Sequence, residues 1–331
     1  MFLNFLQKII QRRKKASINP EMSSSKNTEQ NKVAEYWGKS LSVSEKKLVA
    51  WMGHPGIQRH INMRITGDPS LDWFTYVNQK YIPVPVERGL SLGCGEGGLE
   101  RHAFFLEKVK HFDAIDISQG AVETARREAE RLGILDKVNY ITADLNRLKL
   151  PLGRYDIVFA SMSIHHIEPL ESLFGQIHAA LREGGYFICN EYIGPTRFQL
   201  PEERIRLIND LLSHLPERLR KLIRNGAATS DIKTSHQNPP LSWFIENDPS
   251  EAIRSGDIVP ALCTCFDIVE EKPYGGGILH FLLQDIIGNF GDENKEDNAW
   301  INMLGYFEKY LEDHDIISSD FSLIVAKSKP S

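Results

Sequence analysis

The feature that most constrains this chain is a cluster of glycines that follows a short apolar run. The stretch reads Leu90-Ser91-Leu92-Gly93-Cys94-Gly95-Glu96-Gly97-Gly98-Leu99. This pattern predicts a strand, a tight turn and the start of a helix. Glycines let the backbone pass close to a ligand, and the N–H groups at a new helix N-terminus point at a bound polar group. We therefore expect a nucleoside or a nucleotide to bind at this turn.

The spacing of the glycines fits two kinds of binding turn. Gly93, Gly95 and Gly98 match the G-x-G-x-x-G pattern of dinucleotide sites. Gly93, Gly95 and Gly97 match the shorter G-x-G-x-G pattern of nucleoside-type methyl donors. A turn of small residues that serves only packing also fits, so the choice depends on the rest of the chain.

From residue 89 onward, short apolar runs alternate with amphipathic segments. The pattern predicts strands at residues 89–92, 111–117, 138–142, 155–160 and 186–193, and helices at residues 99–109, 120–132 and 169–181. Such alternation favours an α/β fold, a doubly wound parallel sheet with helices on both faces. Ligands of these sheets bind beyond the carboxyl ends of the strands, so the site is expected among the residues that follow each strand.

We divide the 331 residues into five segments. They are a basic N-terminal segment with a polar linker (1–30), a helical cap (31–85), a cofactor-binding core (86–195), a helical substrate-lid insertion (196–260) and a part that completes the sheet (261–331). In the last part we expect a strand at 266–271, helices at 278–287 and 298–311 and a final strand at 321–327. Tyr36 in the helical cap is the candidate lid contact over the cofactor, with ordinary core packing as the alternative.

Charge limits the partners of this protein. The formal net charge of -5 argues against a general nucleic-acid-binding protein. Residues 1–15 have the opposite charge, because they carry basic but no acidic side chains. Apolar residues in this segment recur at the spacing of one helix face. This segment suits an anionic membrane surface or a partner protein, and a poorly ordered terminus is the alternative. No apolar run approaches the roughly 20 residues that span a bilayer, and the order of charges is wrong for a signal peptide.

The four cysteines are interpreted as free thiols. Cys263 and Cys265 have no second cysteine pair or histidine cluster to complete a zinc site, so we expect no metal. Alternate positions on a strand face the same side of a sheet, which is the placement expected for this pair. Free thiols fit a reducing compartment, so we expect a cytoplasmic protein, peripheral to a membrane if residues 1–15 bind one.

Two carboxylates follow predicted strands. Asp116 ends the second strand, where it can accept hydrogen bonds from both ribose hydroxyls of a nucleoside. Ser118 already provides the helix cap that is the alternative role of Asp116. Asp144 follows the third strand, where it can accept from the exocyclic amine of adenine while Leu145 lies against the ring. A simple turn aspartate is the alternative for Asp144.

Taken in order, these motifs resemble a class I S-adenosylmethionine-dependent methyltransferase. The resemblance covers roughly residues 87–192 and rests on the turn at 92–97, Ile115-Asp116-Ile117-Ser118, Thr142-Ala143-Asp144-Leu145, Tyr155-Asp156-Ile157-Val158, His165-His166-Ile167 and Leu181-Arg182-Glu183-Gly184-Gly185. The last of these motifs favours it over a nicotinamide dehydrogenase. The resemblance implies a Rossmann-like, seven-stranded and mostly parallel sheet with an antiparallel last strand, N-terminal helices and a helical lid insertion after strand 5.

The resemblance implies S-adenosylmethionine as the cofactor and S-adenosylhomocysteine as the product. The residues that it assigns to the cofactor are Gly93, Cys94, Gly95, Gly97, Asp116, Ile117, Asp144, Leu145 and Ser161, with Tyr36 added from the helical cap. One position departs from the family pattern. Ser91 stands where an acid usually helps to orient the glycine turn and the amino group of the cofactor, so either Ser91 or another group is expected to do this work.

A hydroxyl acceptor requires a base near the methyl group. His165 and His166 follow the fourth strand and Glu191 ends the fifth, so these three are the catalytic candidates. The alternative is that one of the histidines has a structural place in the turn.

Segments outside the core resemble bacterial methyltransferases that act on sugars, glycans or secondary metabolites, which implies Tyr192, Arg254 and His280 as substrate contacts. Solvated helix charge for Arg254 and core packing for His280 are the alternatives. We therefore expect methyl transfer to a hydroxyl of a small molecule, sugar or glycan. An N-methyltransferase acting on a small amine, and a non-catalytic cofactor-binding scaffold protein, are the other hypotheses.

Overall fold

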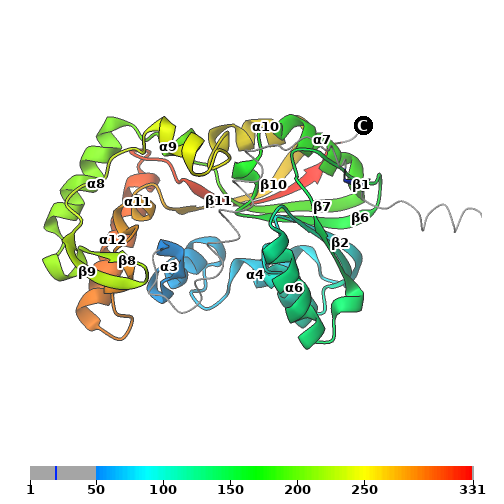
Figure 1. The fold of residues 1–331 in the computed structure, drawn as a ribbon, viewed down its shortest axis with the longest axis horizontal. Coiled ribbons are helices and arrows are strands. Elements are labelled where there is room, and N and C mark those ends of the chain that lie inside the picture. The colour runs from blue at the N-terminus through cyan, green and yellow to red at the C-terminus, as the bar shows by residue number, and fades with distance from the viewer. Residues whose placement is uncertain (1–18, 21–49, 330–331) are drawn as a thin grey trace, which may run out of the picture.

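The computed structural model describes residues 19–20 and 50–329, and seven strands in this part of the chain form one mixed sheet. The order is β10-β11-β7-β6-β2-β3-β4 (Figure 1). The strands are β2 (Val86–Leu92), β3 (Val109–Asp116), β4 (Val138–Thr142), β6 (Tyr155–Ser161), β7 (Leu181–Tyr192), β10 (Phe266–Gly275) and β11 (Phe321–Ser328). Strand β11 is antiparallel to both of its neighbours, whereas the five strands from β7 to β4 pair in parallel. The predicted doubly wound, mostly parallel seven-stranded sheet is confirmed.

Alternate side chains of each strand enter two separate cores. On β6, Ile157 and Phe159 belong to one apolar cluster and Val158 and Ala160 to the other. The first cluster includes α4 (Trp73–Tyr81), α5 (Gly98–Phe105) and α6 (Gln119–Arg131), and the second includes α7 (Leu170–Ala180) and α10 (Ile258–Cys265). Figure 1 shows α6 on one face of the sheet and α7 and α10 on the other. Burial on both faces explains why these strands read as continuous apolar runs.

Local signals start the helices next to the site. Ser118 caps α6, because its hydroxyl accepts a hydrogen bond from the backbone N–H of Ala121 at 3.3 Å. Helix α5 begins after Gly97, which has a left-handed φ of 77°. Small buried residues of α6, among them Ala121, Ala125 and Ala129, let this helix pack closely on the sheet.

The remaining helices extend the molecule beside the sheet (Figure 1). They are α3 (Pro55–Thr66), α8 (Glu202–His214), α9 (Leu241–Glu246), α11 (Leu279–Leu283) and α12 (Lys295–Asp313). Two small sheets pair β8 (Lys221–Arg224) with β9 (Ala227–Ile232), and β1 (Asn19–Pro20) with β5 (Leu148–Lys149). Single 3₁₀ turns lie at Trp51–Gly53, Leu135–Lys137, Ile164–His166, Thr196–Phe198, Glu217–Leu219, Ser255–Asp257 and Ile287–Asn289. No helix in the described part of the chain is both long and apolar enough to cross a membrane.

Three expectations about local structure are wrong. The helix expected at residues 99–109 ends at Phe105, because Glu107 adopts a left-handed φ of 57° and Val109 begins β3. Cys263 and Cys265 lie on helix α10 rather than on a strand, since the apolar residues before them pack on α7. The insertion expected to be helical at residues 196–260 is not wholly so, because it contains the β8–β9 hairpin. Tyr36 and residues 1–15 lie outside the described part, and the five segment boundaries stay predictions.

Candidate functional site

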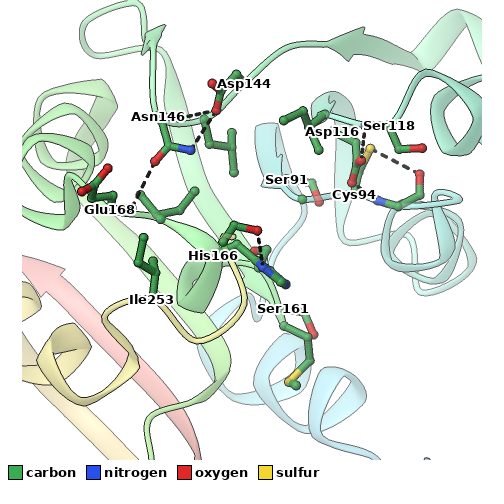
Figure 2. Close-up of a pocket in the computed structure, with 18 of the residues that line it drawn as sticks. Ser91, Cys94, Asp116, Ser118, Asp144, Asn146, Ser161, His166, Glu168 and Ile253 are labelled. Carbon is green, nitrogen blue, oxygen red and sulfur yellow. Dashed lines mark hydrogen bonds between the residues drawn. The ribbon is translucent and has the colours of Figure 1, made fainter. Parts of the chain in front are cut away.

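The carboxyl ends of the central strands lie level with one another. Leu92 on β2 pairs with Ile115 on β3 and with Ala160 on β6, and Asp116 pairs with Thr142 on β4. A cavity of about 760 Å³ lies beyond these ends, within the range of about 300–1,000 Å³ that is usual for small-molecule sites. Figure 2 shows side chains from several of these strand ends and from the loops that follow them around this space. The cavity is therefore the candidate functional site.

Two glycines of the turn after β2 line the cavity for different reasons. Gly93 has a φ of 71° and Gly95 a φ of 51°. The N–H groups of Gly93 and Cys94 both donate to the carbonyl of Ile115, at 2.8 and 2.9 Å. A Cβ on Gly93 would lie 2.3 Å from the Cβ of Ser163, whereas one on Gly95 would meet nothing within 4 Å. A glycine is thus required at residue 93 because Ser163 lies against it. Gly95 instead leaves open space at the cavity.

Gly97 and Cys94 were both predicted to bind the cofactor, and they differ in position. Gly97 is not among the residues that line the cavity, and a Cβ on it would lie 2.6 Å from the Tyr140 hydroxyl oxygen. It therefore shapes the turn. Cys94 lines the cavity, and burial raises the pKa of its thiol, so this side chain remains a neutral thiol at physiological pH.

The carboxylate of Asp116 connects the glycine turn to the end of β3. One oxygen accepts from the N–H of Gly95 and the other from the N–H of Ser118, both at 2.8 Å. Burial raises the pKa of Asp116, and the N–H groups of Ser118, Gly95 and Ile117 oppose that rise. Asp116 and Ile117 both line the cavity. Each carboxylate oxygen has a further lone pair, so Asp116 can still accept hydrogen bonds from a ligand.

A second carboxylate lies on the other side of the cavity. Asp144 accepts from the backbone N–H and the side-chain amide of Asn146, both at 2.9 Å. The side-chain carbonyl of Asn146 accepts from the N–H of Glu168 at 3.1 Å. Asp144, Leu145, Asn146 and Glu168 all line the cavity, and Figure 2 shows this chain of contacts facing Asp116 across it.

His165 forms a buried contact with two carboxylates. Its Nδ1 lies 2.7 Å from Oε2 of Glu191, and its Nε2 lies 3.6 Å from Oε1 of Glu251. Glu191 also accepts the N–H groups of Ser163 and Ile164, so it fixes the turn after β6. Burial alone would lower the pKa of His165, but the attraction of Glu191 and Glu251 raises it above its ordinary value. His165 and Glu191 are not among the cavity-lining residues.

His166 has the opposite surroundings. It lines the cavity, and its Nδ1 lies 3.0 Å from the Ser250 hydroxyl oxygen. That hydroxyl lies 2.7 Å from Oδ1 of Asp248, to which it donates. Burial, followed by the charge of His165, holds the pKa of His166 well below its ordinary value. The imidazole, which Figure 2 shows among the side chains around the cavity, is therefore neutral at physiological pH.

His165, His166 and Glu251 also bring one ligand-type atom each within 4.8 Å of one another. Such a group has the composition of a metal site. However, both ring nitrogens of His165 face a carboxylate, Glu191 on one side and Glu251 on the other.

A distant loop closes one side of the cavity. Pro249, Ser250 and Ile253 line it, and the N–H of Ile253 donates to the carbonyl of His165 at 3.1 Å. Sequence reasoning placed this loop in the lid but did not identify these residues. Asn146, Ser163 and Glu168 were also missed. The only local signal was for Asn146, which directly follows Asp144 and Leu145.

Comparison with known proteins agrees with this geometry. A protein family described as "Methyltransferase domain" matches residues 90–189, which run from β2 to β7. This chain carries a class I, S-adenosylmethionine-dependent methyltransferase domain. The sheet order, the glycine turn after β2 and the carboxylate at the end of β3 are the features of the domain that the structure displays directly.

Curated relatives match the methyltransferase domain only over part of their length. The sterol 24-C-methyltransferase of Aspergillus fumigatus is 32% identical over 108 residues, which is 31% of this chain and 27% of that protein. The malonyl-[acyl-carrier protein] O-methyltransferase 1 of Ilyobacter polytropus is 29% identical over 113 residues, 34% of this chain and 41% of that protein. The chain thus spans less than half of these relatives.

A solved structure is similar over nearly the whole length of the chain. The geranyl diphosphate C-methyltransferase of Streptomyces coelicolor, in complex with Mg²⁺, geranyl diphosphate and S-adenosyl-L-homocysteine, aligns with a TM-score of 0.51 at 13% identity. The alignment covers 93% of this chain and 100% of that one. At 13% identity this likeness shows a shared fold and nothing more.

The three side chains predicted to contact substrate do not line the cavity of the methyltransferase domain. Arg254 pairs with Glu171 and Asp257, so it ties the loop at residues 248–254 to the start of α7. His280 is half-buried among aromatic rings that include Tyr192, and desolvation lowers its pKa to about 3. The Tyr192 hydroxyl donates to the carbonyl of Pro195 at 3.0 Å. Ser161, which was predicted to bind the cofactor, does line the cavity.

Proposed function

We propose that this protein transfers a methyl group from S-adenosylmethionine to a hydroxyl of a small polar acceptor, such as a small molecule, a sugar or a glycan. In this proposal His166 is the general base. The observation that carries the proposal is a neutral imidazole in the wall of a cavity that also holds the nucleoside-binding turn.

The cavity residues fit an adenosine-based cofactor. The remaining lone pairs of Asp116 suit the two ribose hydroxyls, and the open space at Gly95 lets a ligand approach the backbone. Leu145 offers an apolar side chain to the adenine ring, beside the carboxylate of Asp144. When bound, S-adenosylmethionine supplies an electrophilic methyl group. The chain contributes alignment and a place for the proton of the acceptor.

Hydrogen bonds fix the tautomer of His166. The Ser250 hydroxyl donates to Asp248, so its oxygen accepts from Nδ1–H of His166. The lone pair of the imidazole then resides on Nε2, a buried atom, and in this proposal Nε2 takes the proton of an acceptor hydroxyl. The low pKa keeps this nitrogen deprotonated at neutral pH. Asp248 and Ser250 are thus positioning residues for the base.

The cavity wall favours a polar acceptor that loses a proton. Asn146, Arg147, Glu168 and Ser250 supply amide, guanidinium, carboxylate and hydroxyl groups around it. The relatives are named for methylation at carbon in one case and oxygen in another, so they do not select the reacting element. A neutral base favours oxygen, because a hydroxyl must release its proton during transfer whereas an amine nucleophile needs less help.

The test pairs a binding assay with turnover of an acceptor panel. Calorimetric titration of the full chain with S-adenosylhomocysteine measures cofactor binding, and labelled S-adenosylmethionine reports transfer to sugars, other hydroxyl compounds and amines. The variant His166→Asn keeps a donor for Ser250 but removes the base. We expect it to lower kcat for the hydroxyl acceptor by about 10²–10⁴-fold and to leave S-adenosylhomocysteine affinity within about twofold. His178→Asn makes the same change on α7, outside the cavity lining, and should leave turnover unchanged.

Each other outcome identifies a different function. Turnover of amines that does not respond to His166→Asn would indicate an N-methyltransferase. Binding of S-adenosylhomocysteine without turnover of any acceptor would indicate a non-catalytic scaffold. Absence of binding would reject the proposal.

A further inference from the structure

A buried carboxylate lies behind the glycine turn, in the first turn of α5. Glu100 is 0% exposed, and neither of its carboxylate oxygens has a hydrogen-bond partner among the described residues. Buried polar side chains are nearly always hydrogen-bonded, and burial of an unpaired carboxylate is costly.

Ser91 separates Glu100 from the cavity. The side chain of Ser91 lines the cavity, although this residue is only 2% exposed. Burial raises the pKa of Glu100 to about 7, and the neighbouring Ser91 hydroxyl opposes that rise. The other titratable groups that act on Glu100 are Arg101, Asp116, Cys94 and Tyr140. Near neutral pH the side chain is therefore poised between its neutral and charged forms.

We propose that Glu100 is a positioning residue for a ligand that carries an ammonium group, which its carboxylate attracts across Ser91 to the glycine end of the cavity. The inference rests on the proposed function, because S-adenosylmethionine and S-adenosylhomocysteine both carry an α-amino group. Ser91 cannot itself present a negative charge, so at this end of the cavity the charge comes from α5 instead of β2. A ligand ammonium favours the ionised form of Glu100, so binding is coupled to release of the Glu100 proton.

The test compares two ligands that differ only at the amino-acid end. S-adenosylhomocysteine carries the ammonium group, and 5′-methylthioadenosine keeps the adenosine and the thioether without it. Glu100→Gln should weaken S-adenosylhomocysteine binding by roughly 10- to 50-fold, which corresponds to a charge pair at an effective dielectric constant of about 20. Binding of 5′-methylthioadenosine should stay within about twofold. Ser91→Asp in the Glu100→Gln background should restore the preference for S-adenosylhomocysteine, because it returns a carboxylate to the cavity wall.

A matched control makes the same change at another buried glutamate. Glu308 on α12 accepts the N–H groups of Gly276, Ile278 and Leu279 and is not in the cavity lining. Glu308→Gln should lower stability without changing the ratio of the two affinities. This control separates a general loss of stability from the loss of a charge near the ligand.

The wild-type protein gives a readout that does not depend on any variant folding. In calorimetry at pH 7, S-adenosylhomocysteine binding should release about half a proton more than 5′-methylthioadenosine binding, measured in phosphate and Tris buffers. The ratio of the two affinities should rise with pH through about 7. If the wild type binds S-adenosylhomocysteine but shows neither effect, the inference about Glu100 is wrong while the proposed function stands. If it binds neither ligand, both are wrong.

Discussion

Gly93 and Gly95 have similar backbone angles, yet the structure predicts very different consequences for replacing each with alanine. A non-glycine residue at positive φ costs about 1–2 kcal/mol, which applies to both positions. At Gly93 the new Cβ would also lie 2.3 Å from the Cβ of Ser163. Ser163 cannot move away easily, because its hydroxyl donates to the Leu92 carbonyl at 2.8 Å and its N–H donates to Glu191. Overpacking of this kind adds about 1–3 kcal/mol.

Gly93→Ala should therefore lower the free energy of unfolding by about 2–5 kcal/mol and Gly95→Ala by only about 1–2 kcal/mol. The order should reverse for ligand affinity, because the methyl group at residue 95 projects into open space at the cavity wall. Urea unfolding with linear extrapolation measures the first quantity, and calorimetry with S-adenosylhomocysteine the second. In a Ser163→Gly background, Gly93→Ala should cost only about 1–2 kcal/mol, because the clash is gone. Equal losses for the two single variants, or no relief in the Ser163→Gly background, would refute the steric reasoning.

Four further outcomes are expected. Asp116→Asn should weaken S-adenosylhomocysteine binding by roughly 10- to 100-fold in calorimetry, since an amide cannot accept at both positions that now receive N–H groups. His165→Gln should lower the free energy of unfolding by about 3–5 kcal/mol near pH 6, because it leaves Glu191 and Glu251 buried without their cation. The pKa of His165 is raised in the folded protein, so its contribution to the free energy of unfolding is present below the unfolded pKa of about 6.5 and is lost as pH rises through the folded pKa. Urea titrations from pH 6 to 9 should therefore show the difference in unfolding free energy between wild type and variant becoming smaller. Prolonged dialysis against a chelator should leave turnover unchanged, because ion pairs already occupy both nitrogens of His165, and activity that returns only with added metal would contradict this. Burial lowers the pKa of Lys233 to about 8, so the unfolded chain binds more protons between about pH 8 and 10.5 and wild-type stability should rise across that window, a rise that Lys233→Met should lack.

The sheet was predictable because its strands are buried on both faces. The strand expected at residues 138–142 coincides with β4, and the last antiparallel strand was expected within one residue of its end. The β8–β9 hairpin gave no such signal, since most of its side chains are exposed or half-buried and do not alternate. Helix α10 was missed because a short, continuously apolar segment has no periodicity that distinguishes a helix from a strand.

The nucleoside end of the site was predictable for a related reason. Asp116 ends β3 and Asp144 lies two residues after β4, so their sequence position fixes their place at the edge of the sheet. The acceptor end depends on contacts between distant segments. Ser250 contacts His166 although the two residues are 84 positions apart in the sequence, and no local pattern predicts such a contact. For the same reason Arg254 was expected to face the substrate, whereas it pairs with Glu171 on α7.

The adjacent histidines show why residue type alone could not assign the base. His165 is buried and His166 is half-buried, and desolvation acts to lower the pKa of each. At His165 two carboxylates outweigh that penalty and favour the charged ring, whose centre lies 4.2 Å from the ring centre of His166. That cation adds to the burial of His166 and keeps the second ring neutral. In the proposed mechanism the charge on His165 keeps His166 in its neutral form, so Glu191 would act on the base through electrostatics although it does not line the cavity. Glu191→Gln should therefore shift the acidic limb of the kcat profile to higher pH, because loss of the His165 charge raises the pKa of His166, and an unchanged profile would show that the two rings titrate independently.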